Sequence, residues 1–276
     1  VVCLTIVTLV QAQIRTHAPA PDNHPSQRPT SLKAGNSTKL LCDSVLEYDG
    51  SNVLNSKIAY TYDANGNNTE YVYYDWNSTS NSWVGKSKSN TTFDANGNKT
   101  EMINYNWNST NNNWVGRDKE TNTYDANGNN TEYVNYIWNN NSWVGESKRT
   151  YTYDINGNMT EKILYNWNSI SKSWIVKSKF TTKYNAQRNK MEEFNYIWNS
   201  IDNSWVNDIK CTYTYDVNGN MMENVNYIWE STSNSWIGSI KYTFTYDSNG
   251  NNTEYVNYIW ESTSNSWIGR DKYTYT

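Results

Sequence analysis

Polar and apolar side chains alternate with a period of two along most of this chain, which is typical of β-strands whose two faces differ. In residues 99–107, Glu101, Ile103, Tyr105 and Trp107 share one face, and the positions between them are Thr, Met and Asn. Aromatic and β-branched residues at alternate positions favour strands, whereas a helix would scatter the same residues around its axis. The pattern therefore predicts an all-β protein.

The alternating segments recur as a tandem repeat that contains all 14 tryptophans. Successive copies lie 31 residues apart, except for one step of 29. The first tryptophan of each copy is Trp76, Trp107, Trp138, Trp167, Trp198, Trp229 or Trp260. The second is Trp83, Trp114, Trp143, Trp174, Trp205, Trp236 or Trp267. A repeat of this length predicts a one-dimensional array of similar hairpins rather than separate globular domains.

Each copy also contains an aromatic residue followed by a turn of the form Asp-x-Asn-Gly-Asn. Its Asp and Gly positions are Asp63 and Gly66, Asp94 and Gly97, Asp125 and Gly128, Asp154 and Gly157, Asp216 and Gly219, and Asp247 and Gly250, with Asn185 in place of the aspartate in the fifth copy. A three-residue loop closed by Asp94 and Asn98, with Gly97 in the left-handed conformation, predicts a type I turn with a G1 bulge. The expected register places Phe93 opposite Lys99.

The register of each hairpin decides which side chains share a face. We expect Thr91 opposite Glu101, so that the recurring glutamates face Thr or Tyr hydroxyls, as in the pair Tyr151 and Glu161. A charge-assisted hydrogen bond at each of these positions would then fix the register. The recurring glutamates are Glu70, Glu101, Glu132, Glu161, Glu192, Glu223 and Glu254.

The second turn of each copy connects the two tryptophans and contains an even number of residues, which places both indoles on one face. In the third copy this turn is two residues shorter, which keeps the parity and leaves Asn140 and Asn141 as a two-residue loop that needs positive φ angles. Paired indoles contribute about 0.5–1.5 kcal/mol beyond the area that they bury. We also expect Tyr74 to lie opposite Gly85, where its ring covers bare backbone.

These elements predict an up-and-down antiparallel meander of about 14 strands with an N-terminal cap. Residues 1–12 are interpreted as a secretory signal peptide without its basic start, because an apolar run ends in Val10-Gln11-Ala12. Residues 13–39 are expected to form a disordered linker rich in Pro, Asn and Ser. Residues 40–62 are expected to be a degenerate capping half repeat, and residues 63–276 seven hairpins followed by a truncated strand. The pattern leaves open whether the sheet is an open ribbon, a spiral or a closed barrel.

Charge, hydropathy and cysteine content narrow the classes of function. A net charge of -4 and a pI near 5.3 argue against binding of nucleic acid. No later segment approaches the roughly 20 apolar residues of a membrane helix, and charges such as Glu101 and Lys86 interrupt both strand faces, so we expect no integral membrane protein. Cys3 belongs to the expected signal peptide, and Cys42 and Cys211 lie in distant parts of the chain, which does not favour a disulfide between them. The fold is therefore expected to form without disulfides, although export usually favours them.

The segment Tyr-Thr-Tyr-Asp-x-Asn-Gly-Asn, present at residues 151–158 and 213–220, resembles the YD repeat of the bacterial RHS and teneurin-type families. The resemblance covers nearly everything from about Ala59 onward, although typical YD repeats are shorter and the Trp-flanked second turn is extra. The chain is also similar to long repeat proteins exported by gliding-type bacteria. These resemblances imply a secreted or surface-exposed array of β-hairpins. In RHS proteins such an array forms a hollow shell around a toxin domain, but this chain contains no protease or toxin motif.

The sequence contains no convincing set of catalytic or metal-binding residues. Both histidines, His17 and His24, lie in the expected linker, and no nucleophile motif is present. The recurring glutamates occupy equivalent environments, whereas glycoside hydrolysis needs two carboxylates with different ones. The Asp-Ala-Asn-Gly-Asn turns superficially resemble calcium loops, but an EF-hand loop has Gly at position six and Glu at position twelve. We therefore predict no enzyme, no catalytic residue and no cofactor, with calcium at the turns as the weaker alternative.

Rows of aromatic residues among Asn and Ser are the strongest candidate for a ligand site. Aromatic rings stack on sugar rings and amides bind hydroxyls, so glycans or other surface proteins are the expected partners. The alternative is that these rings pack the sheet itself, because hairpins must bury apolar area somewhere. The candidate glycan-contacting tyrosines are Tyr74, Tyr105, Tyr136, Tyr165, Tyr196, Tyr227 and Tyr258.

Taken as a whole, the sequence favours an exported, non-enzymatic repeat protein that acts as a cell-surface or extracellular scaffold, spacer or adhesin. The first alternative is a carbohydrate-binding array that uses exposed Trp and Tyr rows, and the second is a fragment of an RHS-like shell around a toxin domain. The last strand leaves an open edge. We therefore expect this chain to associate with itself edge to edge.

Overall fold

All regular elements in the described residues, 10–17 and 39–275 of the computed structural model, are β-strands, and these ranges contain no helix. Consequently no helix in them is long and apolar enough to cross a membrane. Three strands precede the repeats: β1 (Val10–His17), β2 (Lys39–Tyr48) and β3 (Leu54–Tyr62). The predicted all-β class is thus confirmed.

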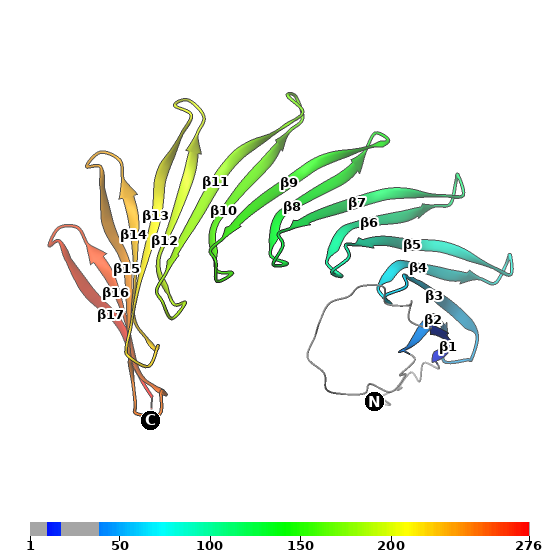
Figure 1. Cartoon of the computed structure of the whole chain (residues 1–276), viewed down its shortest axis with the longest axis horizontal. Coiled ribbons are helices and arrows are strands. Elements are labelled where there is room, and N and C mark those ends of the chain that lie inside the picture. The colour runs from blue at the N-terminus through cyan, green and yellow to red at the C-terminus, as the bar shows by residue number, and fades with distance from the viewer. Residues whose placement is uncertain (1–9, 18–38, 276) are drawn as a thin grey trace, which may run out of the picture. The chain divides into compact units, whose positions relative to one another are not determined.

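Seven hairpins then account for the 14 strands β4 to β17, as the repeat predicts (Figure 1). Their bounds are β4 (Asn68–Asn77) and β5 (Ser82–Phe93), β6 (Lys99–Asn108) and β7 (Asn113–Tyr124), β8 (Asn130–Asn139) and β9 (Ser142–Tyr153), β10 (Met159–Asn168) and β11 (Ser173–Tyr184), β12 (Lys190–Asn199) and β13 (Ser204–Tyr215), β14 (Met221–Glu230) and β15 (Ser235–Tyr246), and β16 (Asn252–Glu261) and β17 (Ser266–Thr274).

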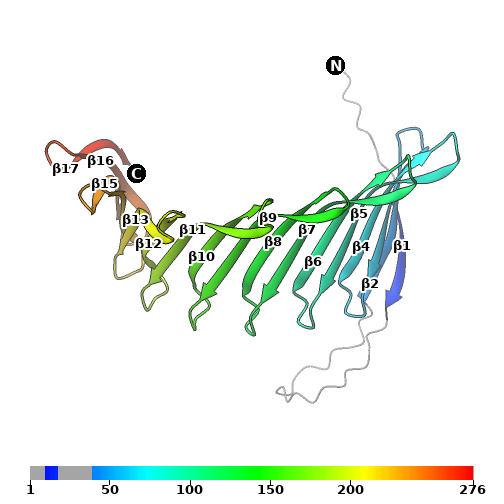
Figure 2. The same ribbon diagram turned by 90° about the horizontal axis from the view of Figure 1, so that it is seen from above.

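The chain divides into two compact units, Val1–Thr123 with Val134–Gly145 and Tyr124–Tyr133 with Glu146–Thr276. In the first unit, each strand from β1 to β7 pairs antiparallel with its neighbour in sequence. The second unit contains the same arrangement from β9 to β17. Figure 2 shows the strands of each unit side by side in chain order. Each unit is therefore the predicted up-and-down meander.

The Asp-containing turns have the predicted geometry. The amide of Asp94 donates to the carbonyl of Asn98 at 2.9 Å, and the amide of Gly97 donates to the carbonyl of Asp94 at 3.1 Å. Gly97 has a φ of +83°, in the left-handed region that glycine adopts without strain. In the fifth copy Arg188 takes the place of the glycine, with a φ of +66°.

The turns between the tryptophans also follow the prediction. In the shortened turn of the third copy, Asn140 and Asn141 have φ angles of +48° and +58°, as a type I′ turn requires. In the longer turns a single residue before the second strand is left-handed, such as Asn81 with a φ of +52°. The turn that is two residues shorter thus has a different turn type, but both of its tryptophans still lie on one face.

The register past the Asp turn differs from the prediction by one residue. Phe93 lies opposite Lys99, as expected, but Glu101 lies opposite Thr92 and not Thr91. Thr100 is the extra residue of a bulge and has no partner in β5. The same shift occurs in the fourth copy, which overturns the expected partner of its recurring glutamate: this carboxylate lies opposite Thr152.

A second bulge, which the sequence pattern did not predict, lies three residues after the second tryptophan of the copy. Tyr74 is opposite Gly85 as predicted, but Tyr73 is opposite Ser87, so that Lys86 is skipped in the register with β4. Its ammonium lies 3.2 Å from the Asp75 carboxylate of β4. Because one residue is skipped, the alternation along β5 changes parity at this point. Ser87 therefore lies on the face opposite to Trp83, whereas uninterrupted alternation along β5 would place both on one face.

The two bulges define two faces in every hairpin. We call one the Trp face: in β4 and β5 it carries Glu70, Val72, Tyr74, Trp76, Trp83, Gly85 and Lys88. The other, the variable face, carries Tyr71, Tyr73, Asp75, Val84, Ser87 and Ser89. The few buried apolar side chains of the hairpins, Val72, Val134 and Val225, lie on the Trp face and are 3–5% exposed.

Strand β1 comes from two segments to which the sequence assigned other roles. Residues 1–9 and 18–38, which contain most of the predicted signal peptide and linker, lie outside the described residues. Val10–His17 pairs with β2, so the part of the predicted linker from Gln13 to His17 is paired rather than disordered. The free edge of β2 offers backbone donors and acceptors that an adjacent extended segment can satisfy.

The half repeat at residues 40–62 contributes most of β2 and all of β3, and its turn follows the same rule as the later ones. The amide of Asp49 donates to the carbonyl of Val53 at 2.8 Å, and the Asp49 carboxylate accepts from the amide of Ser51 at 2.9 Å. Asn52, with a φ of +61°, takes the place of glycine. This segment thus contains an eighth turn of the same type, although only its aspartate matches the repeat signature closely.

Candidate functional site: the Trp face and the variable face

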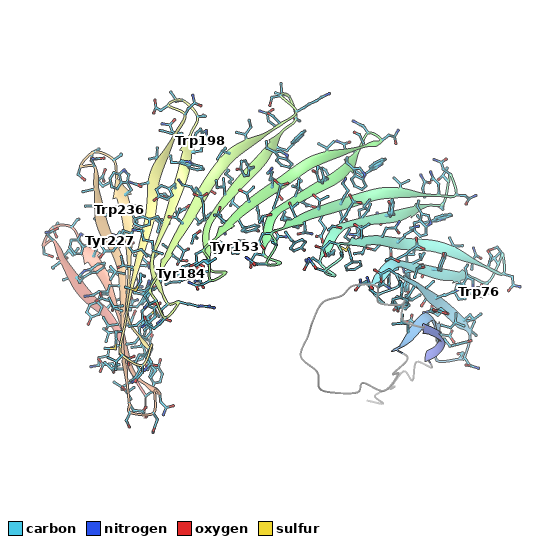
Figure 3. The ribbon with its side chains drawn as sticks, in the orientation of Figure 1. Trp76, Tyr153, Tyr184, Trp198, Tyr227 and Trp236 are labelled. Carbon is cyan, nitrogen blue, oxygen red and sulfur yellow. The ribbon has the colours of Figure 1, made fainter. Side chains whose placement is uncertain are left out.

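The tryptophans form seven cross-strand pairs, one in each hairpin, as the repeat predicts. Trp76 lies directly opposite Trp83, and the other pairs with described register match. Ring centroids are 4.8–5.1 Å apart and the planes meet at 65–73°, which is the edge-to-face arrangement that aromatic quadrupoles favour. Figure 3 shows Trp198 and Tyr184 toward opposite ends of their strands, next to the two kinds of turn.

Three of the tryptophan pairs also cover a glycine of the preceding hairpin. A Cβ atom added to Gly85 would lie 2.8 Å from Trp114 and 2.9 Å from Trp107, both of which belong to the next hairpin. Gly116 and Gly238 have the same relation to the tryptophan pairs that follow them, with closest approaches of 2.9 and 2.8 Å. The expected partner of Gly85 in β4 is confirmed, but the covering rings come from the next copy. Glycine is present because the indoles occupy the space of its side chain.

We call the contact between two consecutive hairpins a junction. The same junction contains a recurring lysine that contacts both hairpins. Lys119 lies 3.4 Å from the Glu101 carboxylate of its own hairpin and 4.9 Å from the centroid of the Tyr136 ring of the next. Equivalent ion pairs join Lys88 to Glu70, Lys148 to Glu132, Lys210 to Glu192, Lys241 to Glu223 and Lys272 to Glu254. Equivalent cation–π contacts join Lys148 to Tyr165, Lys179 to Tyr196, Lys210 to Tyr227 and Lys241 to Tyr258. The recurring glutamates therefore pair with lysine, and not with the hydroxyls that the sequence suggested.

The tyrosine before the Asp turn joins the two strands of its own hairpin, at the end away from the tryptophan turn. The hydroxyl of Tyr153, at the end of β9, donates to the carbonyl of Asn130, at the start of β8, at 2.8 Å. Tyr184 and Tyr246 donate in the same way to the carbonyls of Met159 and Met221 at 3.0 and 2.9 Å. Each of these hydrogen bonds therefore holds together the two strands of one hairpin.

The carboxylates of the turn aspartates accept hydrogen bonds from residues of their own turns. In the second copy, Asp94 Oδ1 accepts from the amides of Asn96 and Asn98 at 2.9 Å, and Oδ2 accepts from the Asn98 side chain at 2.9 Å. The hydrogen bond from the Asn98 side chain, helped by the backbone donors, lowers the pKa of Asp94. Backbone donors are neither mobile nor displaceable, so these carboxylates are poorly placed to bind calcium, which takes six to eight oxygen ligands. No group of three metal-binding side chains occurs in the described residues.

The variable face differs in almost every copy at the same register positions. The residue after the recurring glutamate is Tyr71, Met102, Tyr133, Lys162, Glu193, Asn224 or Tyr255. Its cross-strand partner is Ser89 for Tyr71, Glu120 for Met102, Phe180 for Lys162, Cys211 for Glu193, Tyr242 for Asn224 and Tyr273 for Tyr255. The tryptophans and the lysine on the Trp face are therefore constant within this chain, whereas these positions of the variable face differ from copy to copy.

One cluster on the variable face contains several ionisable groups. Glu193 accepts from the Tyr213 hydroxyl at 2.5 Å and from Lys190 at 2.7 Å. Burial works against ionisation of Glu193, but these hydrogen bonds outweigh it and lower the pKa of the carboxyl. Burial also raises the pKa of the neighbouring Cys211 thiol, with help from Glu193. A cavity of about 210 Å³ lies against these residues and Phe180.

This cluster lacks the geometry of a catalytic centre. The Cys211 thiol donates to the Asn226 side chain at 2.9 Å, and its raised pKa keeps it protonated and poorly nucleophilic. Of the two histidines, His17 ends β1 and His24 lies outside the described residues. The cluster is a hydrogen-bonded polar group within the sheet.

The candidate glycan-contacting tyrosines lie on the Trp face and are half-buried. Five of the seven have a lysine ammonium over the ring, at 4.6–5.6 Å from the centroid. A ring face that already binds a cation is less available to a sugar. The structure thus places these residues in the junctions between hairpins.

One feature of this arrangement, the second bulge, is visible in the sequence when the seven copies are compared, although alternation within one strand does not reveal it. The recurring lysine is present in all seven copies, five residues after the second tryptophan. Glycine recurs two residues after this tryptophan in five of the seven copies. Positions two and five residues after the tryptophan cannot share one face of an uninterrupted strand. This change of parity indicates the second bulge.

No protein-family model and no curated protein matches the chain. Among solved structures, it is similar to a protein of unknown function from Bacteroides fragilis, with 19% identity, 47% of this chain and 92% of that chain covered, and a TM-score of 0.40. It is also similar to a DUF3836 family protein from Bacteroides vulgatus, with 22% identity, coverage of 34% and 90%, and a TM-score of 0.30. A third similarity is to the Photorhabdus luminescens Tc holotoxin pore, with 15% identity, coverage of 81% of this chain but 14% of that one, and a TM-score of 0.23. These similarities are weak, and they do not indicate a function.

Proposed function

We propose that this chain is an exported, non-enzymatic repeat protein whose hairpin array serves as a scaffold or spacer at the cell surface or outside the cell. One observation carries the proposal: the side chains that recur in every copy are used to join consecutive hairpins. The tryptophans and the lysine recur in all seven copies and glycine in five of them, and they meet between consecutive hairpins, as in Gly85 with Trp107 and Trp114. An array held by identical junctions can change in length without a change of fold.

Export is the second part of the proposal and rests on the sequence alone. The apolar run that ends in Val10-Gln11-Ala12 has the character of a signal peptide. The resemblance to YD-repeat proteins supports the same location. Expression with the natural N-terminus, followed by fractionation and N-terminal sequencing of the product, tests this part directly.

Removal of one repeat tests the scaffold. Deleting residues 221–251, a full 31-residue copy, joins Asn220 to Asn252 and keeps every junction type. We expect the shortened chain to keep the β-sheet circular dichroism spectrum and cooperative urea unfolding of the full chain. The matched control deletes residues 221–234, which removes one strand and its turn and reverses the direction of all later strands. If both deletions unfold the protein, or if neither does, the array is not modular and the proposal fails.

A carbohydrate-binding array is the second candidate, because the aromatic rows lie among Asn and Ser and their rings are only half-buried. A glycan array combined with titration of tryptophan fluorescence separates it from the scaffold. A pure scaffold gives no hit and no change in fluorescence. Saturable quenching by a glycan would favour the carbohydrate-binding array.

An RHS-like shell around a toxin domain is the third candidate, and it rests on the resemblance of the Asp turns to YD repeats. A shell needs a cargo domain on the same polypeptide. Sequencing of the coding region beyond residue 276 tests it, since a toxin domain there would favour the shell and further repeats would favour the scaffold.

A further inference from the structure

The variable face becomes apolar over the last three hairpins of the second unit. Next to the tryptophan turns, Ile197 lies opposite Val206, Ile228 opposite Ile237, and Ile259 opposite Ile268. Their exposure is high for such side chains: 51% for Ile197, 54% for Ile228, 41% for Ile259 and 42% for Ile268. We call these six residues the Ile stripe.

The Ile stripe is a property of these hairpins and not of the repeat. The position before the first tryptophan is Asp75, Asn106 and Asn166 in three earlier copies, and isoleucine in the others. The array therefore tolerates a polar residue at this position, and its junctions do not require the isoleucines. Contiguous exposed apolar side chains on a soluble protein mark a surface that another molecule covers.

A row of bulge residues runs beside the Ile stripe and carries opposite charges at its two ends. Asp208 in β13, Ser239 in β15 and Arg270 in β17 are the residues without a cross-strand partner at the second bulge of each hairpin. The Asp208 carboxylate contacts the Asn195 side chain on the variable face. The Arg270 side chain is 65% exposed and lies 3.6 Å from the carboxylate of Asp271 in its own strand, so a contact with Asp208 of a second copy has to compete with this exposed ion pair. The neutral Ser239 lies midway between the two charges.

This order of charges is complementary to itself under a two-fold rotation. A two-fold axis that lies between the two stacked sheets and runs parallel to β15 places β13 of one copy opposite β17 of the other, which brings Asp208 against Arg270 at both ends of the Ile stripe. The stripe then faces its own equivalent, as in an isologous interface. Two sheets that stack with apolar inner faces are a common arrangement.

We propose that the variable face of β12 to β17 is a dimer interface, in which the Ile stripe of one copy packs on that of a second copy and Asp208 pairs with Arg270. This inference is independent of the scaffold function, which concerns junctions within one chain. It also differs from pairing of two β17 edges, because the contact is between sheet faces. The dimer doubles the array without use of the Trp face.

Sedimentation velocity of the purified chain over about 1–100 μM tests the proposal, because interfaces of modest affinity dissociate within this range. We expect a concentration-dependent dimer. Replacing Ile197 and Ile228 by Asn, the residue found in two other copies, should raise the dissociation constant at least about tenfold while the circular dichroism spectrum is unchanged. The matched control is Ile137→Asn, at the same repeat position but outside the Ile stripe, which should leave the dimer intact.

A charge exchange tests the two-fold arrangement itself. Asp208→Arg and Arg270→Asp should each weaken the dimer, because each places like charges together. The double variant should recover it, because the pairs form again with reversed sign. The circular dichroism spectrum of each single variant, compared with that of the parent chain, shows whether it is folded.

Pairing of β17 edges is the competing mode. The amide of Tyr275 donates to the carbonyl of Thr253, so the amide of Thr274 is directed away from β16. Thr274→Pro removes this donor and would disrupt edge pairing, but it should leave the face-to-face dimer intact. A chain that is monomeric at all concentrations, or a dimer that is lost in Thr274→Pro and insensitive to the Asn substitutions and charge exchange, would overturn the proposal.

Discussion

The hairpin of β14 and β15 and that of β16 and β17 have nearly the same sequence and belong to the same unit, yet their environments differ. A Cβ atom at Gly238 would lie 2.8 Å from Trp260, whereas at Gly269 the nearest atom belongs to Tyr258 at 3.8 Å. The side chain of Lys241 is 20% exposed and that of Lys272 is 59% exposed. The difference arises because β15 is followed by another hairpin and β17 is the last strand described.

This comparison shows where the stabilising contacts of the repeat lie. Both hairpins contain a tryptophan pair, a glycine, a glutamate and a lysine, but the glycine and lysine acquire their full contacts only from the next copy. The repeat therefore stabilises the molecule through junctions between hairpins more than through contacts within each hairpin. Nearest-neighbour coupling of this kind is the general property of repeat arrays.

The largest expected effect comes from filling the space of the covered glycine. Gly238→Val should lower the free energy of unfolding by about 1–3 kcal/mol, because its side chain overlaps the indoles of Trp260 and Trp267. Gly269→Val should change it by less than about 0.5 kcal/mol. Urea unfolding followed by circular dichroism measures both. Equal losses would mean that the glycine is needed for backbone reasons and not for the indoles.

Two copies show that the array can adapt at this position, since Val176 and Asn207 take the place of glycine there. The Trp198–Trp205 and Trp229–Trp236 pairs that follow keep centroid distances of 5.0 and 5.1 Å. For this reason we expect Gly238→Val to destabilise the protein by an amount typical of overpacking, and not to unfold it completely.

The next effect concerns the lysine of the junction. Lys241→Gln removes an ammonium from the ring of Tyr258, and should cost about 1 kcal/mol. Lys272→Gln, with the ion pair to Glu254 but no following ring, should cost much less, as exposed ion pairs do. The same urea experiment, repeated in 1 M salt, checks the assignment. A loss at Lys241 that disappears in salt would indicate the ion pair with Glu223 instead of the ring.

A smaller effect is expected at the one Asp-type turn of the repeats without glycine at the left-handed position. Arg188 has a φ of +66°, and this backbone conformation costs a non-glycine residue about 1–2 kcal/mol. Replacement by Gly removes this cost. Glycine also increases the entropy of the unfolded chain, which lowers the free energy of unfolding by about 0.4–1 kcal/mol. Arg188→Gly should therefore stabilise the protein by about 0.5 kcal/mol, and Gly250→Ala should destabilise it. Thermal unfolding of the two variants tests the pair, and a destabilised Arg188→Gly variant would show that the arginine side chain makes a necessary contact.

The smallest effect is expected from acid, because the turn aspartates are exposed. Hydrogen bonds from Asn98 and Asn129 lower the pKa of Asp94 and Asp125 below the unfolded value near 3.9. This contribution to stability is complete above about pH 4 and is lost as the pH falls through the folded pKa. The urea midpoint should therefore be flat from about pH 7 to 5 and fall below about pH 4. The fall should be shallower when both aspartates are replaced by Asn, as Asn185 already is in the fifth copy, and an equal fall would assign the acid sensitivity to other carboxylates.

The sequence predicted the strands, both kinds of turn and the tryptophan pairs, because each depends on local rules. Gly97 and Asn141 need positive φ angles, and the even loop between tryptophans sets their common face. The sequence pattern missed the bulges at Thr100 and Lys86, because one skipped residue leaves the composition of a strand unchanged and alters only which side chains meet.

The contacts of the tyrosines and lysines were missed for a different reason. Alternation within a strand says which residues share a face, but not that Lys119 reaches Tyr136 in the next hairpin. These contacts depend on the distance between neighbouring strands and on the register after the bulge. The constant lysine was visible in all seven copies, and its partner became apparent only in the fold.

The covering of each glycine by the next tryptophan pair is tested most directly by a double-mutant cycle between Gly238 and Trp260. We measure the free energy of unfolding in urea for the parent chain, Gly238→Val, Trp260→Leu and the double variant. If the indole occupies the space above the glycine, Gly238→Val costs little once Trp260 is replaced, and the coupling free energy is about 1–2 kcal/mol. If the two substitutions are additive within about 0.5 kcal/mol, the indole does not cover the glycine and the account of the junction is contradicted.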